Sequence, residues 1–196
     1  SPGGGVYLFD GGGTTTARLA NTLFSANAAS AGAGFCQDTF SGGTIGTTIT
    51  QATFAGNRSD AFTRGRVLHV AESTGTSTLT LANSIVWDGD GNVPSASRVG
   101  ASGTLTLERN LIESGEGEVL VRTGATLNSD GATLDADPLF VRPERDFGTD
   151  TTPGGVDDDT PADLRLLPGS AALDAGALAA LDFDGNTTRD LTADLD

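Results

Sequence analysis

Apolar and polar positions alternate along this chain in a pattern that occurs four times. Each copy opens with a threonine-rich alternating stretch, passes through a polar bend and ends in an apolar pair. The copies are residues 15–24, 46–54, 77–86 and 103–112. Internal repetition is the signature of architectures in which each unit stacks on its neighbours. The pattern therefore predicts a fold built by stacking.

Alignment of the four copies produces columns of matching residues. The first apolar column is Leu19, Ile49, Leu81 and Leu107. A second apolar column follows, with Phe24, Phe54, Val86 and Ile112. Between the two lies a polar column, with Asn21, Gln51, Asn83 and Arg109. We expect the apolar columns to face a core and the polar column to form a bend.

A second series of short β-prone segments lies between the copies. Its members are residues 5–8, 34–36, 66–70, 97–99 and 118–121. Each period of about 30 residues thus holds at least two alternating segments, separated by Gly-rich and Asp/Asn-rich stretches. Helical repeats of similar length need a signature that is missing here. We predict an all-β fold, a right-handed parallel β-helix (solenoid) of about four rungs with an irregular C-terminal cap.

The repeat pattern divides the chain into two parts. Residues 1–122 form the predicted β-helix body, and residues 123–196 form the C-terminal rung and an Asp/Pro-rich cap. Within the cap, residues 171–181 suit one or two short helices. Asn27 and Asn57 coincide in the alignment, which predicts an asparagine stack at a turn.

The C-terminal part carries three distinctive motifs. They are the segments 134–141 (LDADPLFV) and 163–176 (DLRLLPGSAALDAG), and Asp182-Phe183-Asp184-Gly185-Asn186. Together they resemble the end of bacterial right-handed parallel β-helix proteins of the pectate-lyase-like superfamily, grouped as choice-of-anchor Q surface proteins. The segment 83–87 is similar to the last-rung motif of that group. The resemblance implies the fold; for function it implies only a range from adhesins and surface proteins to carbohydrate enzymes. The proline usual after this last motif is replaced by Thr187.

Charge narrows the classes of partner. The chain has 196 residues and a formal net charge of −15, with 26 acidic and 11 basic residues. This charge repels phosphate, so we expect no nucleic acid and no docking on anionic lipid. No apolar run is long enough for a transmembrane helix, so we expect no membrane insertion. An acidic chain suits an exported protein, and we predict an extracellular or cell-surface location.

The last of the three motifs offers oxygen ligands for Ca²⁺. Asp182, Asp184, Asn186 and Asp190 supply carboxylate and amide oxygens around a glycine turn. No glutamate closes the loop as in an EF-hand. The alternative is an ordinary Asx-rich turn.

Catalytic chemistry has weak candidates. Polysaccharide lyases use a base with Ca²⁺ or a cationic side chain, and hydrolases use paired carboxylates. Asp88 and Asp90 are the carboxylates, with Arg66, Arg98 and Arg109 nearby in the repeats. The segment 88–92 (DGDGN) also reads as a plain turn, which we favour. The alignment places Ser25, Ala55 and Glu113 in the column of Asp88 and so adds no adjacent Asp. We therefore assign no catalytic residue.

Single reactive side chains complete the inventory. Cys36 is the only cysteine and His69 the only histidine, and each lies in an apolar segment. We expect Cys36 to be a buried, inert thiol and His69 to be packed. Trp87 and Tyr7 are able to stack on sugars, but core or edge packing is the simpler interpretation.

These observations favour a secreted or cell-surface non-catalytic β-helix module with a structural, adhesive or assembly role. One alternative is a carbohydrate-active enzyme, a polysaccharide lyase or hydrolase with an Asp/Arg groove. The other is a head-to-tail filament subunit that self-associates through an open N-terminal rung, since no capping segment precedes the first glycines. In the favoured case we expect carbohydrate or another partner to be bound by the variable turns, the cap or the open end.

Overall fold

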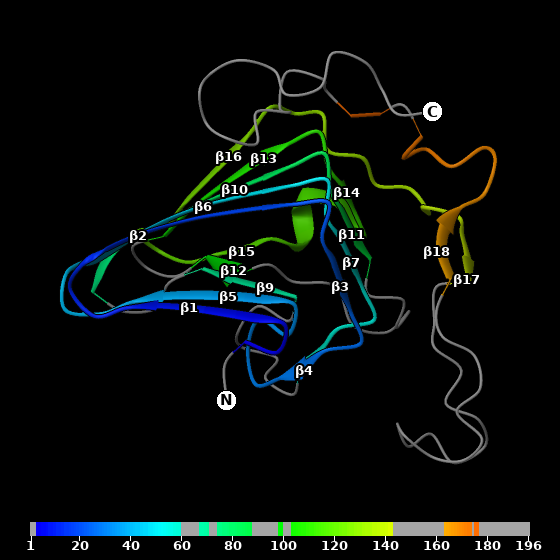
Figure 1. Ribbon diagram of the computed structural model, residues 1–196. Coiled ribbons are helices and arrows are strands. Elements are labelled where there is room, and N and C mark those ends of the chain that lie inside the picture. The colour runs from blue at the N-terminus through cyan, green and yellow to red at the C-terminus, as the bar shows by residue number, and fades with distance from the viewer. Residues whose placement is uncertain are drawn as a thin grey trace, which may run out of the picture.

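The computed structural model describes residues 3–59, 67–70, 74–87, 98–99, 103–142, 163–173 and 175–176. Over these residues the chain is all-β, with one short 3-10 helix, η1 (Gly115–Glu118), and no α-helix. Figure 1 shows the strands gathered into a few sheets whose members lie side by side. No helix in this described part is long and apolar enough to cross a membrane.

Three parallel sheets make up most of the described structure (Figure 1). The first sheet has, in spatial order, β1 (Val6–Asp10), β5 (Phe35–Thr39), β9 (Leu68–Val70), β12 (Arg98–Val99) and β15 (Leu120–Val121). The second has β2 (Thr14–Ala20), β6 (Gly43–Thr50), β10 (Gly75–Ala82), β13 (Gly103–Glu108) and β16 (Thr126–Ser129). The third has β3 (Leu23–Ser25), β7 (Thr53–Ala55), β11 (Ile85–Trp87) and β14 (Leu111–Ile112).

Two small pairs complete the strand inventory of the described residues. β4 (Ala28–Ala29) pairs in parallel with β8 (Arg58–Ser59). β17 (Phe140–Arg142) pairs antiparallel with β18 (Asp163–Leu166), near the C-terminal end of the described chain.

The chain visits the sheets in rotation, so strands that follow one another in sequence belong to different sheets. Neighbours within a sheet are one repeat apart. Parallel neighbours cannot be joined by a tight hairpin and need a long connection. Here each connection contains the strands of the other sheets.

The strand register confirms the columns predicted from the sequence. Leu19 pairs with Ile49, Ile49 with Leu81, and Leu81 with Leu107. The second apolar column is likewise in register, as Phe24, Phe54, Val86 and Ile112. The exact register matters because a shift of one residue would turn every side chain of the strand to the other face of the sheet.

The polar column is a repeated left-handed bend. Asn21, Gln51, Asn83 and Arg109 have φ of 51°, 52°, 49° and 51°. A non-glycine residue adopts this region at some cost, and asparagine tolerates it best. The recurrence of the same backbone conformation explains why strands of the second and third sheets meet at the same corner in each repeat.

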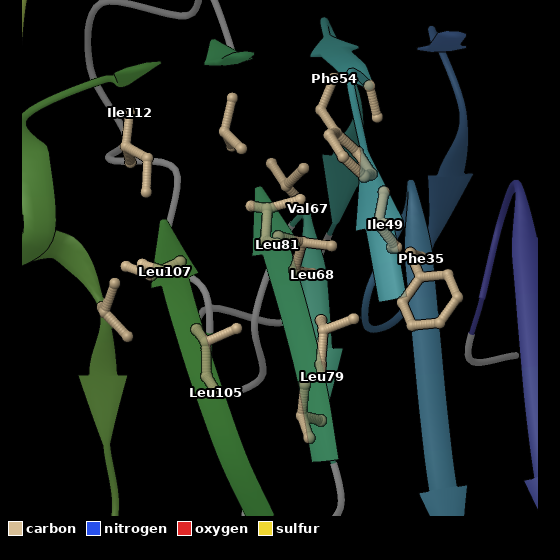
Figure 2. Packing of buried hydrophobic residues seen from close by; sticks show 14 of the residues in the cluster. Phe35, Ile49, Phe54, Val67, Leu68, Leu79, Leu81, Leu105, Leu107 and Ile112 are labelled. Carbon is tan, nitrogen blue, oxygen red and sulfur yellow. The ribbon is translucent and has the colours of Figure 1, made fainter. Parts of the chain in front are cut away.

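The core lies between the sheets. Figure 2 shows Ile49, Leu81 and Leu107 of the second sheet side by side, with Phe54 and Ile112 of the third sheet beyond them. Phe54 has no exposed surface, and its ring stacks on that of Phe24 at 4.5 Å between centroids and 6° between planes. The apolar cluster contains Phe24, Phe35, Ile49, Ala52, Phe54, Val67, Leu68, Val70, Leu79, Leu81, Val86, Leu105, Leu107, Ile112 and Val119.

Buried amide and hydroxyl side chains connect successive repeats at the corners. Asn27 Nδ2 donates to Asn57 Oδ1 at 2.9 Å, which confirms the predicted asparagine stack. At another corner Ser84 Oγ accepts from the Ala52 N–H at 3.0 Å, and Asn110 Oδ1 accepts from the Ser84 N–H at 3.0 Å. These side chains satisfy backbone groups that the bend removes from the strand ladders.

Two details of the sequence interpretation need correction. The column assigned to Asp88 is wrong by one position, because Trp87 pairs with Ala55 and Ala55 with Ser25. Residues 171–173 form a turn where a short helix was expected, while residues 174 and 177–181 of that segment lie outside the described residues. Pro168 and Gly169, which precede this turn, suit turn geometry better than a helix start. The boundary at residue 122 stays a prediction; just beyond it, β16 extends the second sheet and Leu134 bridges to Leu111.

Candidate functional site

Most side chains singled out for chemistry lie outside the described residues. This holds for Asp88, Asp90 and Arg66 of the catalytic set, and for the predicted calcium ligands Asp182, Asp184, Asn186 and Asp190. Arg98 is placed in β12, where its backbone pairs with His69 and Leu120, but its side chain is not described. The catalytic groove and the calcium loop therefore stay predictions. Among the described residues, no three His, Cys, Asp or Glu side chains gather as a metal site would require.

Cys36 and His69 lie next to each other on the first sheet, where their backbones are in register. Cys36 has no exposed surface, which confirms the buried thiol, and only 3% of His69 is exposed, which confirms the packed histidine. Neither is accessible to a large substrate. Tyr7 precedes Cys36 in the same column and is exposed, and its ring lies 6.3 Å from that of Phe9. Burial raises the pKa of the Tyr7 phenol, with the Asp38 charge as the second cause.

Within the described ranges, two carboxylates have a lowered pKa, and local hydrogen bonds explain both. Asp10 accepts from Thr15 Oγ1 at 2.8 Å and from the N–H groups of Gly13 and Gly12, which lowers its pKa. Arg165 holds the pKa of Asp163 to about 2 through a side-chain bond at 2.6 Å. The hydrogen bonds of Asp10 fix the turn between β1 and β2. Because the pKa of Asp10 and that of Asp163 are lowered, neither carboxyl group suits the role of a general acid near neutral pH.

The most ordered surface feature is the outer face of the second sheet. Side chains alternate across a strand, so one set points to the core and the other to solvent. In β10 the core set is Ser77, Leu79 and Leu81, all buried, and the outer set includes the exposed Thr76 and Thr78. We call the outer threonines of this sheet the threonine face. Its members are Thr14, Thr16, Thr44, Thr48, Thr76, Thr78, Thr80, Thr104, Thr106 and Thr126.

The strand register arranges these threonines in straight columns. One column runs through Thr16, Gly46, Thr78, Thr104 and Thr126. The next runs through Arg18, Thr48, Thr80, Thr106 and Asn128. Neighbouring strands lie about 4.8 Å apart, and alternate residues on one strand about 6.7 Å apart. The face is therefore a two-dimensional grid with a fixed repeat in each direction.

The chemistry of the grid is uniform and nearly neutral. Threonine carries a hydroxyl that donates one hydrogen bond and accepts two, beside a methyl group. Its β-branched side chain is stiff at χ1, so little order is lost on contact. Arg18 and Glu108 are the only charged residues at the described outer positions, in a chain whose net charge is −15. The face suits a neutral, regular, hydrogen-bonding partner.

Sequence reasoning missed this face as a site. The threonines entered the sequence interpretation only as part of the alternating pattern, and binding was expected in the turns, the cap or the open end. The available signal was their parity: in 76–80 and 104–106 threonine falls at alternate positions, out of phase with the apolar column. A residue type that repeats on the solvent side is not required by the core.

Comparison with known proteins adds no further assignment. No protein-family model, no curated protein and no solved structure matches this chain.

Proposed function

We propose that this chain is a non-catalytic module of a secreted or cell-surface protein that adsorbs to ordered surfaces through its threonine face. The fold behind it would be a right-handed parallel β-helix of about four rungs, of the pectate-lyase-like type. Support comes from the rotation of the chain through three parallel sheets in constant register. Such a scaffold holds a flat array of side chains in fixed register.

The observation that carries the proposal is the alignment of threonines across five parallel strands. Core packing explains the inward columns, but it places no demand on the outward ones. Exposed positions of an ordinary sheet vary among polar and charged residues, and strongly charged chains usually carry charges there. A neutral threonine grid on such an acidic chain is best explained by contact with a surface.

An adsorption assay tests the proposed function. The purified chain is mixed with suspended solids (crystalline cellulose, crystalline chitin and ground ice), and its depletion from the supernatant is measured. We expect retention on at least one solid and its loss in Thr78→Lys, because the lysine stands out from the centre of the grid. Thr53→Lys, on the third sheet, is the matched control and should be retained like the parent chain.

Two results of this assay would contradict the proposal. One is the absence of retention on every solid, or equal retention of Thr78→Lys and the parent. The other is release of soluble sugar or of unsaturated uronate from polysaccharide, with or without Ca²⁺. Such release would favour the lyase or hydrolase alternative, and its loss in Asp88→Ala or Asp90→Ala would locate the groove.

Self-association is a second candidate, favoured by the edge formed by β1, β2 and β3. Each is the terminal strand of its sheet in the described structure. Core-facing Leu19 on β2 is only half-buried, although its register partner Ile49 is fully buried. On the same edge strands Phe9 and Leu23 are 55% and 58% exposed. Unpaired strand edges with apolar neighbours are templates for another strand.

Light scattering after size exclusion tests the association over a range of protein concentrations. We expect oligomers to increase with concentration, and more so in high salt, because salt screens the repulsion between acidic chains. Phe9→Lys combined with Leu23→Lys should restore the monomer, whereas Val141→Lys, on the distant β17, should not. A strictly monomeric parent chain at all concentrations and salt levels would exclude this candidate.

A further inference from the structure

We infer that the ordered surface recognised by the threonine face is ice. This inference rests on the proposed function and names its partner. It begins from the second sheet, whose strands β2, β6, β10, β13 and β16 lie side by side (Figure 1). The strand register makes threonine hydroxyl and methyl groups repeat across and along this sheet.

The first step is the match of repeats. The grid spacings are set by the backbone, at about 4.8 Å across strands and about 6.7 Å along them. Crystal planes of ice present water oxygens whose repeats are of similar length in two perpendicular directions. Threonine hydroxyls held at those spacings are able to take the place of water oxygens of the ice lattice, or to hold waters at those positions, along several strands at once. A flexible soluble polymer has no such two-dimensional repeat.

The second step is the match of chemistry. Ice is neutral, and each of its waters both donates and accepts hydrogen bonds. The threonine hydroxyl does the same, and its methyl group fills the space between waters. Charged side chains retain strongly bound liquid-like water, which is costly to remove. The described grid keeps charge to its borders, at Arg18 on the terminal strand β2 and Glu108 at the end of β13.

The third step is rigidity. Each outer threonine stands on a strand whose opposite side is anchored in the core. In β10 Leu79 and Leu81 are buried on the inner side, and Thr78 and Thr80 project from the same backbone. The Thr78 hydroxyl also donates to the Ile45 carbonyl on the neighbouring strand β6, at 3.5 Å. A preordered grid loses little conformational entropy on contact with a solid.

The grid has one gap, which offers a gain-of-function test. Gly46 stands where the column would place a threonine, between Thr16 and Thr78. A Cβ at Gly46 meets only Thr78 Oγ1, at an ordinary contact distance, and the backbone there is not in the left-handed region. Gly46→Thr should therefore fold, and it should complete the column.

The experiment grows ice slowly from a dilute solution of the full chain and measures the protein in the ice and in the remaining liquid. A second readout is the rate at which small ice crystals coarsen near the melting point. We expect enrichment of the parent chain in ice and slowed coarsening. Gly46→Thr should strengthen both effects, Thr78→Lys should abolish both, and Thr53→Lys should leave both unchanged. Circular dichroism verifies that each variant is folded.

The outcomes separate this inference from the proposed function. Exclusion of the parent chain from ice, or enrichment that Thr78→Lys does not reduce, overturns the ice inference. If the chain is then retained on cellulose or chitin through the threonine face, the proposed function stands with another partner. If Thr78→Lys changes adsorption to no solid, both fail. Weaker ice binding by folded Gly46→Thr also contradicts the lattice match.

Discussion

Replacement of Phe54 by alanine is expected to lower the free energy of unfolding by about 3–5 kcal/mol. Phe54 has no exposed surface and stacks on Phe24 with ring centroids 4.5 Å apart. The alanine removes the ring from the middle of the second apolar column, and the surrounding strands cannot collapse without losing their register. Urea denaturation monitored by circular dichroism measures the change.

The matched control for this prediction is Phe40→Ala. Phe40 is 55% exposed, so the same truncation should cost only about 0.5 kcal/mol or less. Equal losses at Phe40 and Phe54 would mean that the stacked column does not organise the core.

The second large effect is expected for Asn57→Ala, a loss of about 2–3 kcal/mol. The Asn57 side chain is 1% exposed; its Nδ2 donates to the Phe24 carbonyl at 3.0 Å and its Oδ1 accepts from the Asn27 side chain at 2.9 Å. Alanine removes the partner of the buried Phe24 carbonyl and that of the half-buried Asn27 amide, which is more costly than the loss of an exposed bond. Thermal and urea unfolding give the measurement.

Two further variants define what the Asn57 result means. Asn128→Ala changes an exposed asparagine on β16 and should be nearly neutral. Asn57→Asp keeps the acceptor but loses the donor to Phe24, so we expect a smaller loss at acid pH, where the carboxyl group can donate, than at neutral pH. An Asn57→Ala chain as stable as the parent would show that the corner stack carries no stability.

The sequence predicted the strands and their columns because equivalent positions in successive repeats have similar burial and equivalent strand neighbours. Leu19, Ile49, Leu81 and Leu107 share one environment, so a single alignment locates them all and the register bears it out. The Asn27–Asn57 stack was predictable for the same reason. The column of Ser25 and Ala55 lies six residues after Leu19 and Ile49. Six residues after Leu81 the chain has Trp87 and not Asp88, and the strand register agrees with this count.

The candidate site was harder to predict because the sequence of a single strand does not tell which of its threonines face the solvent. Thr78 and Thr47 both stand in threonine-rich strands and look alike in the sequence. Thr47 nevertheless faces inward and is buried, whereas Thr78 is exposed. Only the pairing of strands reveals that Thr78 continues into Thr104 and Thr126. Propensity thus predicts the element, and register alone reveals the face.

The constant register has a consequence for how such a chain changes length during evolution. Thr14 and Thr76 both pair with Thr44, so the two outer strands present equivalent partners to the strand between them. A duplication or deletion that spans one whole repeat therefore joins surfaces that already fit, whereas a partial one shifts every later column. Whole-unit changes would therefore enlarge or shrink the outer array by one strand at a time, while the pairing of the other strands is kept.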